Sequence, residues 1–584
     1  MCGIAGVMTR DGASPDPSVL DALSAALAHR GPDGRGRHLR DDVGLVHDRL
    51  AIIDLATGDQ PLGGPDGHCA LVANGEIYNY LELRAEMPEA RFRTQSDCEP
   101  ALHLYCRFGT GFAKRLRGMY AIAIHDARNR RLILARDPFG IKPLYFAETP
   151  AGFAFASEPQ ALVAAGLVTP RIDPHARNEL LQLQFTTASI FQGIERVAPG
   201  ETLVVEGGRV AERRRLEPLP AGGVVQDDQN RILYRLDEVL AESVLLHQRS
   251  DVPYGMFLSG GIDSSVLLAM MARLNPRPVL AFTAGFPGTG VHDERELARL
   301  LARQVGAEHR EVEIGEGDFW RLLPEIAAAV DDPIADYAIV PTYVLAREAS
   351  RHVKVVLSGE GGDELFAGYG RYRAAMRPWP FARAMRRRGT FDGLNVLREK
   401  PAGWRSGIDA AERRLKRDGL SKLQWAQAVD CEHWLPDDLL IKLDRCLMAH
   451  GVEGRVPFLD PVVADFAFRL PDGMKVRKGL GKYALRRWLE TALPAARPFA
   501  KKRGFTVPVG EWIARRPTLG PLVARQPAIA EIARPEAVAH LFATGGLGHH
   551  AFAAWTLLFY ALWHRRHVEG LPPQGDVFDT LAAR

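Results

Sequence analysis

The run Phe257-Leu258-Ser259-Gly260-Gly261-Ile262-Asp263-Ser264-Ser265 combines glycines, hydroxyls and one carboxylate. An apolar run precedes it and a helix-forming run follows. This order predicts a strand, a tight turn and a helix whose first N–H groups suit a phosphate or pyrophosphate. Asp263 is suited to a Mg²⁺ that bridges phosphate oxygens. The spacing is not that of a Walker A loop, and the alternative is a serine-capped helix after a glycine turn.

A second turn of this kind is Ser358-Gly359-Glu360-Gly361-Gly362-Asp363, which follows the apolar run 353–357. If the two strands are neighbours in a parallel sheet, their carboxyl ends meet at one edge. Asp263 and Asp363 are then expected to lie close enough to share Mg²⁺.

Cys2 follows the initiator methionine directly. Removal of that methionine would leave a thiol and a free α-amine on one residue. The amine has an ordinary pKa near 8 and can act as the base for its own thiol. An exposed amino-terminal nucleophile is therefore expected at Cys2, against the alternative of a chance cysteine at this position.

The elements that must position these residues fall into two regions. Over about the first 165 residues, short apolar segments alternate with glycine, proline, asparagine and aspartate turns, which predicts a strand-rich α+β layered domain. The expected strands are 4–8, 43–47, 50–53, 69–73, 120–125, 131–135, 144–146 and 153–156, and the expected helices are 17–27, 80–87 and 99–108. Strands and turns continue to about residue 215.

After the turn-rich segment 222–229, strands alternate with longer helical patterns, which predicts a doubly wound parallel sheet. The expected strands are 252–258, 279–284, 308–314 and 353–357, and the expected helices are 232–249, 266–274, 293–305, 318–330 and 341–351. Beyond about residue 366 the pattern is almost wholly helical. We therefore expect two domains, 1–215 and 230–584.

Composition excludes several classes of protein. The chain has 584 residues, 46% of them hydrophobic and 25% charged, which is typical of a globular protein. A net charge of +3 argues against nucleic acid or an anionic membrane as a partner. Neither a secretory signal nor a membrane-spanning run is visible, and the six cysteines form no C-x-x-C pair. A cytoplasmic protein with free thiols is expected.

Several motifs in the first region occur in a fixed order. They are Arg30-Gly31-Pro32-Asp33, His47-Asp48-Arg49-Leu50-Ala51-Ile52-Ile53-Asp54, Asn74-Gly75-Glu76-Ile77-Tyr78-Asn79, Ser96-Asp97-Cys98-Glu99 and Arg136-Asp137-Pro138-Phe139-Gly140-Ile141-Lys142-Pro143. Together they resemble the glutaminase domain of N-terminal-nucleophile amidotransferases, in the glutamine-hydrolysing asparagine synthetase family. The loop at 257–265 likewise resembles the pyrophosphate loop of ATP pyrophosphatases. The resemblance implies an αββα sandwich followed by an ATP-pyrophosphatase-type α/β domain with a helical C-terminal extension.

For glutamine, the resemblance implies Cys2 as nucleophile, with Asn74 and the Gly75 N–H as oxyanion donors. Arg49 would bind the glutamine carboxylate, and Asp97 with Glu76 would bind its ammonium. The glutamine-binding residues implied are Arg49, Leu50, Ile52, Ile53, Asn74, Gly75, Glu76 and Asp97.

For the second reaction, the resemblance implies ATP and Mg²⁺ as cofactors, with Asp263 and Asp363 as the metal ligands. Glu360 would act beside the reacting carbonyl, and Lys482 would meet the charge on the phosphates. The ATP-binding residues implied are Phe257, Leu258, Ser259, Gly260, Gly261, Asp263, Ser264, Ser265, Ala284, Ser358 and Gly359. Arg455 is expected to pair with a buried acid at a domain interface.

The implied activity is amide formation on aspartate or another carboxylic acid, with ammonia passing through an apolar passage between the domains. The stretch 331–342 departs from the family pattern, because it is acidic and no arginine precedes Arg347. An acceptor with its own α-carboxylate would need a cation there. Aspartate, a peptide, sugar or secondary-metabolite acid, and a non-catalytic relative therefore remain alternatives. A homodimer is one assembly compatible with the resemblance.

Overall fold

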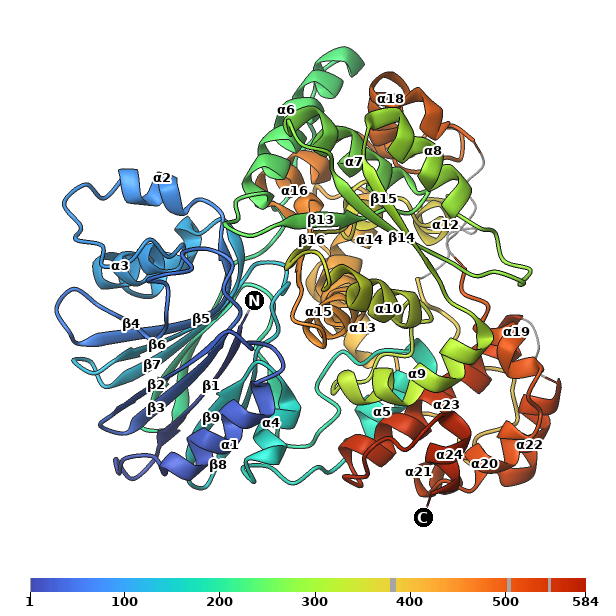
Figure 1. The fold of residues 1–584 in the computed structure, drawn as a ribbon, viewed down its shortest axis with the longest axis horizontal. Coiled ribbons are helices and arrows are strands. Elements are labelled where there is room, and N and C mark those ends of the chain that lie inside the picture. The colour runs from blue at the N-terminus through green and yellow to red at the C-terminus, as the bar shows by residue number, and fades with distance from the viewer. Residues whose placement is uncertain (1, 379–384, 501–505, 545–547, 584) are drawn as a thin grey trace.

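The computed structural model describes residues 2–378, 385–500, 506–544 and 548–583. Over these residues, an antiparallel β-sandwich, blue in Figure 1, is followed by a five-stranded parallel sheet with helices and a helical C-terminal region. This confirms the predicted fold class. We keep 1–215 and 230–584 as the proposed domains.

The sandwich has two six-stranded sheets within the described residues. In spatial order the first contains β10 (Glu195–Arg196), β8 (Tyr145–Thr149), β9 (Gly152–Ala156), β1 (Gly3–Thr9), β3 (Val43–Arg49) and β2 (Gly34–Arg40). The second contains β12 (Arg209–Arg215), β11 (Glu201–Glu206), β7 (Arg131–Arg136), β6 (Gly118–Asp126), β5 (Cys69–Ile77) and β4 (Leu62–Gly63). Alternate apolar side chains such as Ile4, Leu45, Val72 and Phe155 pack between the sheets.

Helices cover the two outer faces of the sandwich (Figure 1). They are α1 (Pro17–Leu27) and α4 (Pro159–Ala164) on the first sheet, and α2 (Tyr80–Ala85) and α3 (Glu99–Phe108) beside the second. A further helix, α5 (Pro174–Leu183), leads away from the sandwich. The outer faces form separate clusters, with Leu20 and Leu23 against Val46 on one side and Leu102 against Ile122 on the other. The layer order is the predicted αββα.

One strand prediction in this region is wrong, and one strand was not predicted. The apolar run 50–53 is a loop in which Leu50 and Ile52 are buried and the Leu50 carbonyl oxygen lies against Cys2 Sγ. The polar segment Gly34–Arg40 is a strand, β2, at the edge of the first sheet, where its outward side chains are exposed. Apolar content alone misled the prediction in both places, because an edge strand can be polar and a cover loop can be apolar.

The parallel sheet has the order β15 (Glu308–Glu313), β14 (Leu280–Gly285), β13 (Tyr254–Phe257), β16 (Val355–Leu357) and β17 (Glu453–Arg455). Its helices include α6 (Gln229–His247), α7 (Ile262–Leu274), α8 (Arg295–Val305), α9 (Glu316–Ala329), α10 (Ile339–Ala349) and α11 (Gly362–Leu365). β13 pairs with β16 in parallel, so the two acidic turns follow neighbouring strands as predicted. The strand β17 was not expected, because three residues with two charges lack a strand pattern.

The C-terminal region is helical apart from β17. Its helices are α12 (Gly370–Ala375), α13 (Ser406–Arg414), α14 (Lys422–Val429), α15 (Ile441–Met448), α16 (Pro461–Phe468), α17 (Asp472–Lys475), α18 (Tyr483–Ala492), α19 (Val509–Ala514), α20 (Leu519–Ala524), α21 (Pro527–Ile532), α22 (Pro535–Thr544), α23 (Gly548–His567) and α24 (Val577–Ala582). A π-helical stretch, Asp430–Leu440, joins α14 to α15. Within the described ranges, every helix is too short or too polar to traverse a bilayer.

Candidate active sites

Cys2 lies at the start of β1, beneath the loop 50–54, and is only 7% exposed. An exposed thiol was expected; the structure instead places Cys2 Sγ 4.0 Å from the Leu50 carbonyl oxygen. Burial raises the pKa of this thiol. The Cys2 N–H donates to Asn74 Oδ1 at 3.1 Å, so the future α-amine lies beside Asn74.

The remaining polar group of Asn74, Nδ2, is fully buried and has no hydrogen-bond partner among the described residues. A buried donor without an acceptor is costly unless a ligand supplies the acceptor. Gly75 follows on β5, where a Cβ would lie 2.1 Å from the Met119 carbonyl oxygen, so the backbone there admits only glycine. The geometry suits an oxyanion at this point.

Glu76 and Asp97 are both buried near this point. Asp97 Oδ2 accepts the Ile77 N–H at 2.7 Å. Burial raises the pKa of Asp97 to about 6. Burial, together with the nearby charge of Asp97, raises the pKa of Glu76 well above its ordinary value. Two carboxylates that repel one another in a dry site favour a cationic ligand such as an ammonium.

Arg49 ends β3 and lies at the edge of the same region. Its Nη1 donates to Asp59 Oδ1 at 2.7 Å and its Nη2 to the Asp54 carbonyl oxygen at 2.5 Å. Asp59 is 81% exposed, so the guanidinium borders solvent. Leu50 and Ile52 are buried and Ile53 is half-buried, and the Ile52 carbonyl accepts the N–H of Asp251 from the second region at 3.0 Å.

The serine-glycine loop joins β13 to α7 as predicted. Its hydroxyls, expected to be ligand donors, are engaged within the loop. Ser264 Oγ donates to the Ser259 carbonyl at 2.8 Å, and the Gly261 N–H donates to Ser259 Oγ at 3.2 Å. Ser265 Oγ donates to the Gly261 carbonyl at 2.7 Å. These bonds hold the turn in shape at the start of α7.

Asp263, Asp363 and Lys482 meet at the ends of the two neighbouring strands. Lys482 Nζ donates to Asp263 Oδ2 and lies 2.8 Å from Asp363 Oδ1. Burial lowers the pKa of Lys482, but the two carboxylates outweigh it and raise the pKa above its ordinary value. A Cβ at Gly368 would lie 1.7 Å from Asp363 Oδ1, which shows how closely the backbone encloses this cluster. Converging carboxylate oxygens are ligands that Mg²⁺ accepts.

A cavity of about 490 Å³ lies above this cluster. The predicted residues that line it are Phe257, Leu258, Ser259, Gly261, Asp263, Ser264, Ala284, Ser358, Gly359, Glu360 and Asp363. Three predicted residues are absent from this lining: Gly260, which faces Leu297, Ser265, and Lys482, which pairs with Asp263 and Asp363. Ser358 Oγ donates to Glu360 Oε2, which fixes that carboxylate beside the nucleotide loop. A cavity of this size accommodates a nucleotide with a small second substrate.

Comparison with known proteins supplies the family. Residues 1–215 match the model of the glutamine amidotransferase domain, and residues 235–565 match that of asparagine synthase. A Mycobacterium tuberculosis H37Rv protein, provisionally named a glutamine-hydrolysing asparagine synthetase, is 36% identical, over 97% of this chain and 98% of its own. The chain belongs to the glutamine-hydrolysing asparagine synthetase family.

Other relatives of this family differ in their names. Asparagine synthetase 1 of Bacillus subtilis is 33% identical over 88% of each chain. A protein of Gibberella zeae named amidase chry2 is 32% identical over 64% of this chain and 60% of its own. The chain is thus an asparagine synthase-family glutamine amidotransferase, with an ATP-pyrophosphatase-type second domain.

In the second region, three charged residues that line the cavity were not predicted from the sequence: Asp336, Glu364 and Lys442. Lys442 on α15 donates from Nζ to Asp336 Oδ2, and both side chains line the cavity. Lys442 supplies the cation that the stretch 331–342 lacks, from 106 residues further along the chain. Glu364 also lines the wall, where burial and Asp363 raise its pKa to about 7. A lysine in an apolar helical run was the signal available in the sequence.

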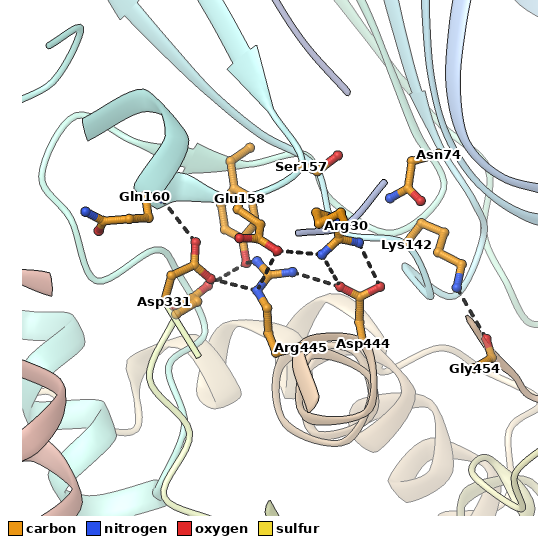
Figure 2. A network of polar contacts seen from close by, with 12 residues as sticks. Arg30, Asn74, Lys142, Ser157, Glu158, Gln160, Asp331, Asp444, Arg445 and Gly454 are labelled. Carbon is orange, nitrogen blue, oxygen red and sulfur yellow. Dashed lines mark hydrogen bonds and ion pairs between the residues drawn. The ribbon is translucent and has the colours of Figure 1, made fainter. Parts of the chain in front are cut away.

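A buried ionic network, defined by Arg30, Glu158, Asp331, Asp444 and Arg445, joins the two regions (Figure 2). Arg30 donates to Glu158 at 2.6 Å and to both oxygens of Asp444 at 2.9 and 3.1 Å. Arg445 donates to Asp331 at 2.7 Å and to Asp444 at 2.9 Å. Arg30 Nε also donates to the Cys2 carbonyl at 3.2 Å. The network therefore connects α15 directly to the backbone of Cys2.

Proposed function

We propose that this chain is an ATP-dependent amidotransferase that hydrolyses glutamine at Cys2 and passes ammonia to an acyl-adenylate. Its acceptor is aspartate, and its products are asparagine, AMP and pyrophosphate. The observation that carries the proposal is that charges suited to phosphates and charges suited to an amino acid line one cavity. The former are Asp263 and Asp363, with Lys482 paired to both beside the cavity, and the latter are Asp336 and Lys442.

In the glutamine half, removal of Met1 leaves a free α-amine on Cys2, at the nitrogen that faces Asn74. This amine acts as the base for the Cys2 thiol. The thiolate attacks the glutamine amide carbon. The developing oxyanion receives hydrogen bonds from Asn74 Nδ2 and the Gly75 N–H. Ammonia leaves, and water hydrolyses the thioester.

In the synthetase half, the acceptor carboxylate attacks the α-phosphorus of ATP and pyrophosphate leaves. Lys482 lies where charge accumulates on the departing phosphates. Asp263 and Asp363 would hold Mg²⁺, which when bound neutralises phosphate charge. Glu360, oriented by Ser358, accepts a proton from ammonia as it attacks the acyl carbon.

The acceptor is argued from the Asp336–Lys442 pair. An acceptor with both a carboxylate and an ammonium can exchange partners with this pair, because Lys442 binds the carboxylate and Asp336 the ammonium. Glu360 and Glu364 add further acidic groups to the same wall. That acidic excess favours a second candidate, a larger acceptor with additional cationic groups.

The test supplies purified protein with Mg-ATP, ammonium and a panel of acids: aspartate, succinate, β-alanine and N-acetylaspartate. Aspartate alone is expected to yield pyrophosphate and AMP in equal amounts, together with asparagine. Succinate lacks the ammonium and β-alanine lacks the α-carboxylate, so each is expected to react poorly. Pyrophosphate release with another amino-bearing acid, and none with aspartate, would decide for the second candidate.

A further inference from the structure

The glutamine pocket is completed by a residue from the other proposed domain. Arg455 lies at the end of β17, and its side chain is fully buried. Its Nη2 lies 3.4 Å from Glu76 Oε1. Among the described residues, Arg455 is the side chain that forms an ion pair with Glu76.

The rest of the guanidinium is fixed by other partners. Arg455 Nε donates to Glu453 Oε1 at 2.6 Å. Its Nη1 donates to the carbonyl oxygens of His247 at 2.9 Å and Arg249 at 2.6 Å. Since these bonds use the other two nitrogens, the side chain cannot turn away, and Nη2 stays directed at Glu76.

The backbone of the same residue belongs to the nucleotide site. The Arg455 carbonyl accepts the Ser358 N–H at 2.8 Å, and Leu357 is its partner across the β16–β17 pair. The position of the guanidinium is therefore set by the strand that carries the second acidic turn.

The surroundings of Glu76 are otherwise acidic. Asp97, from the segment before α3, and Glu453, from β17, both face it, and the buried phenol of Tyr78 lies nearby. Burial and the charges of Asp97 and Glu453 raise the pKa of Glu76, whereas Arg455 lowers it. Without the arginine, Glu76 would be neutral over a wider pH range and would lose its attraction for an ammonium.

We propose that Arg455 is a positioning residue for glutamine hydrolysis, which favours the ionised form of Glu76 and directs it at the ammonium of glutamine from across the domain interface. The proposal rests on the glutamine site of the proposed function. It adds that the first domain alone does not form a complete glutamine pocket.

The main variant is Arg455→Gln, assayed for ammonia release from glutamine. We expect the KM for glutamine to rise about tenfold or more with kcat changed by less than about threefold, since the lost charge acts on ground-state binding. The acid limb of kcat/KM moves to higher pH, because Glu76 then protonates at higher pH. Ammonium-dependent pyrophosphate release, which needs the Arg455 backbone alone, stays within about twofold. Arg455→Lys keeps the charge and restores part of the KM.

The matched control is Arg117→Gln, which removes an interdomain arginine whose ion partners are Asp460, at 2.8 Å, and Glu242. It is expected to leave the glutamine KM and the acid limb unchanged. In a Glu76→Gln background, Arg455→Gln should add less than about twofold to KM, because the partner is already gone. An unchanged KM in Arg455→Gln, or effects that multiply in the double variant, overturns the proposal.

Two arms keep the test decisive. If Arg455→Gln also loses ammonium-dependent activity, Glu453→Gln is measured instead. That variant removes a negative charge near Glu76, so the acid limb should move to lower pH, and an unmoved limb overturns the proposal. If wild-type turnover is absent, the proposed function fails, but Arg455 can still be tested by binding. The Kd for glutamine is measured in a Cys2→Ala background with and without Arg455→Gln. A ratio of the two Kd values near one overturns the proposal.

Discussion

The nucleotide cavity and the glutamine pocket are built in different ways. The cavity is formed by turns that follow adjacent strands of one sheet, with Lys482 added from the segment before α18. The glutamine pocket combines β1, β5 and the loop 50–54 of the sandwich with Arg455 from the parallel sheet. Both acidic turns of the proposed nucleotide site follow strands of one sheet, whereas the proposed glutamine pocket is completed across an interface.

This difference predicts which changes stay local. A substitution within the nucleotide cluster should leave glutamine hydrolysis intact, since the ion pairs of that cluster join Lys482 to Asp263 and Asp363, all three from the second region. A substitution at the interface should affect the glutamine pocket even when it lies in the synthetase region. The predictions below test that asymmetry, from the largest expected effect to the smallest.

Cys2→Ala is expected to lower glutamine hydrolysis by about 10³-fold or more, because it removes the nucleophile. Ammonium-dependent pyrophosphate release should remain within about twofold of wild type. Ammonia release and pyrophosphate release are assayed in parallel. A Cys2→Ala variant that still hydrolyses glutamine would refute the choice of nucleophile.

Lys482→Met is expected to lower the kcat of pyrophosphate release by about 10²–10³-fold, because the buried ammonium no longer meets phosphate charge. Glutamine hydrolysis without ATP should be unchanged. The control is Lys478→Met on the neighbouring exposed turn, which should change neither activity. Loss of both activities in Lys482→Met, with the fold retained, would contradict the separation of the two sites.

Asp444→Asn breaks the buried ionic network and leaves Arg30 with Glu158 as its acidic partner and one fewer negative charge nearby. Removal of one partner from a buried pair costs about 3–5 kcal/mol, so the urea midpoint should fall clearly. Asp465→Asn breaks an exposed pair with Arg469 and should cost about 0–1 kcal/mol. Glutamine hydrolysis should also fall in Asp444→Asn, because Arg30 holds the Cys2 carbonyl. Equal urea midpoints for the two variants would argue against a structural role for the network.

The smallest effect is a pH dependence. Burial raises the pKa of Asp97 to about 6, and its charged form is the one that binds an ammonium. The kcat/KM for glutamine should therefore fall as the pH drops through about 6, while ammonium-dependent synthesis keeps a different profile. Asp97→Asn should remove the step near pH 6 and leave the step that belongs to Glu76. An acid limb unchanged by Asp97→Asn would assign it to another group.

Much of the fold and of each candidate site was predictable from local pattern. The turns at Asp263 and Asp363 each follow an apolar strand, and parallel pairing of the two strands brings the turns side by side. What the sequence hid lies across long separations. Lys442 reaches Asp336 from a segment that carries no site pattern of its own, and the buried acids that pair with Arg455, expected but not named from the sequence, are Glu76 and Glu453. The burial of Cys2 was also missed, because the run 50–53 has the composition of a strand but forms a loop against Cys2.

The central claim is that nitrogen passes from Cys2 to the acceptor within one chain. Wild-type protein is given aspartate, Mg-ATP, glutamine labelled with ¹⁵N at the amide, and an excess of unlabelled ammonium salt. The pH is chosen so that ammonia in solution is almost wholly protonated. The account predicts asparagine whose amide is mostly ¹⁵N, because ammonia released at Cys2 reaches the acyl-adenylate before it mixes with solvent. Asparagine labelled only in proportion to the bulk ammonium pool would contradict it.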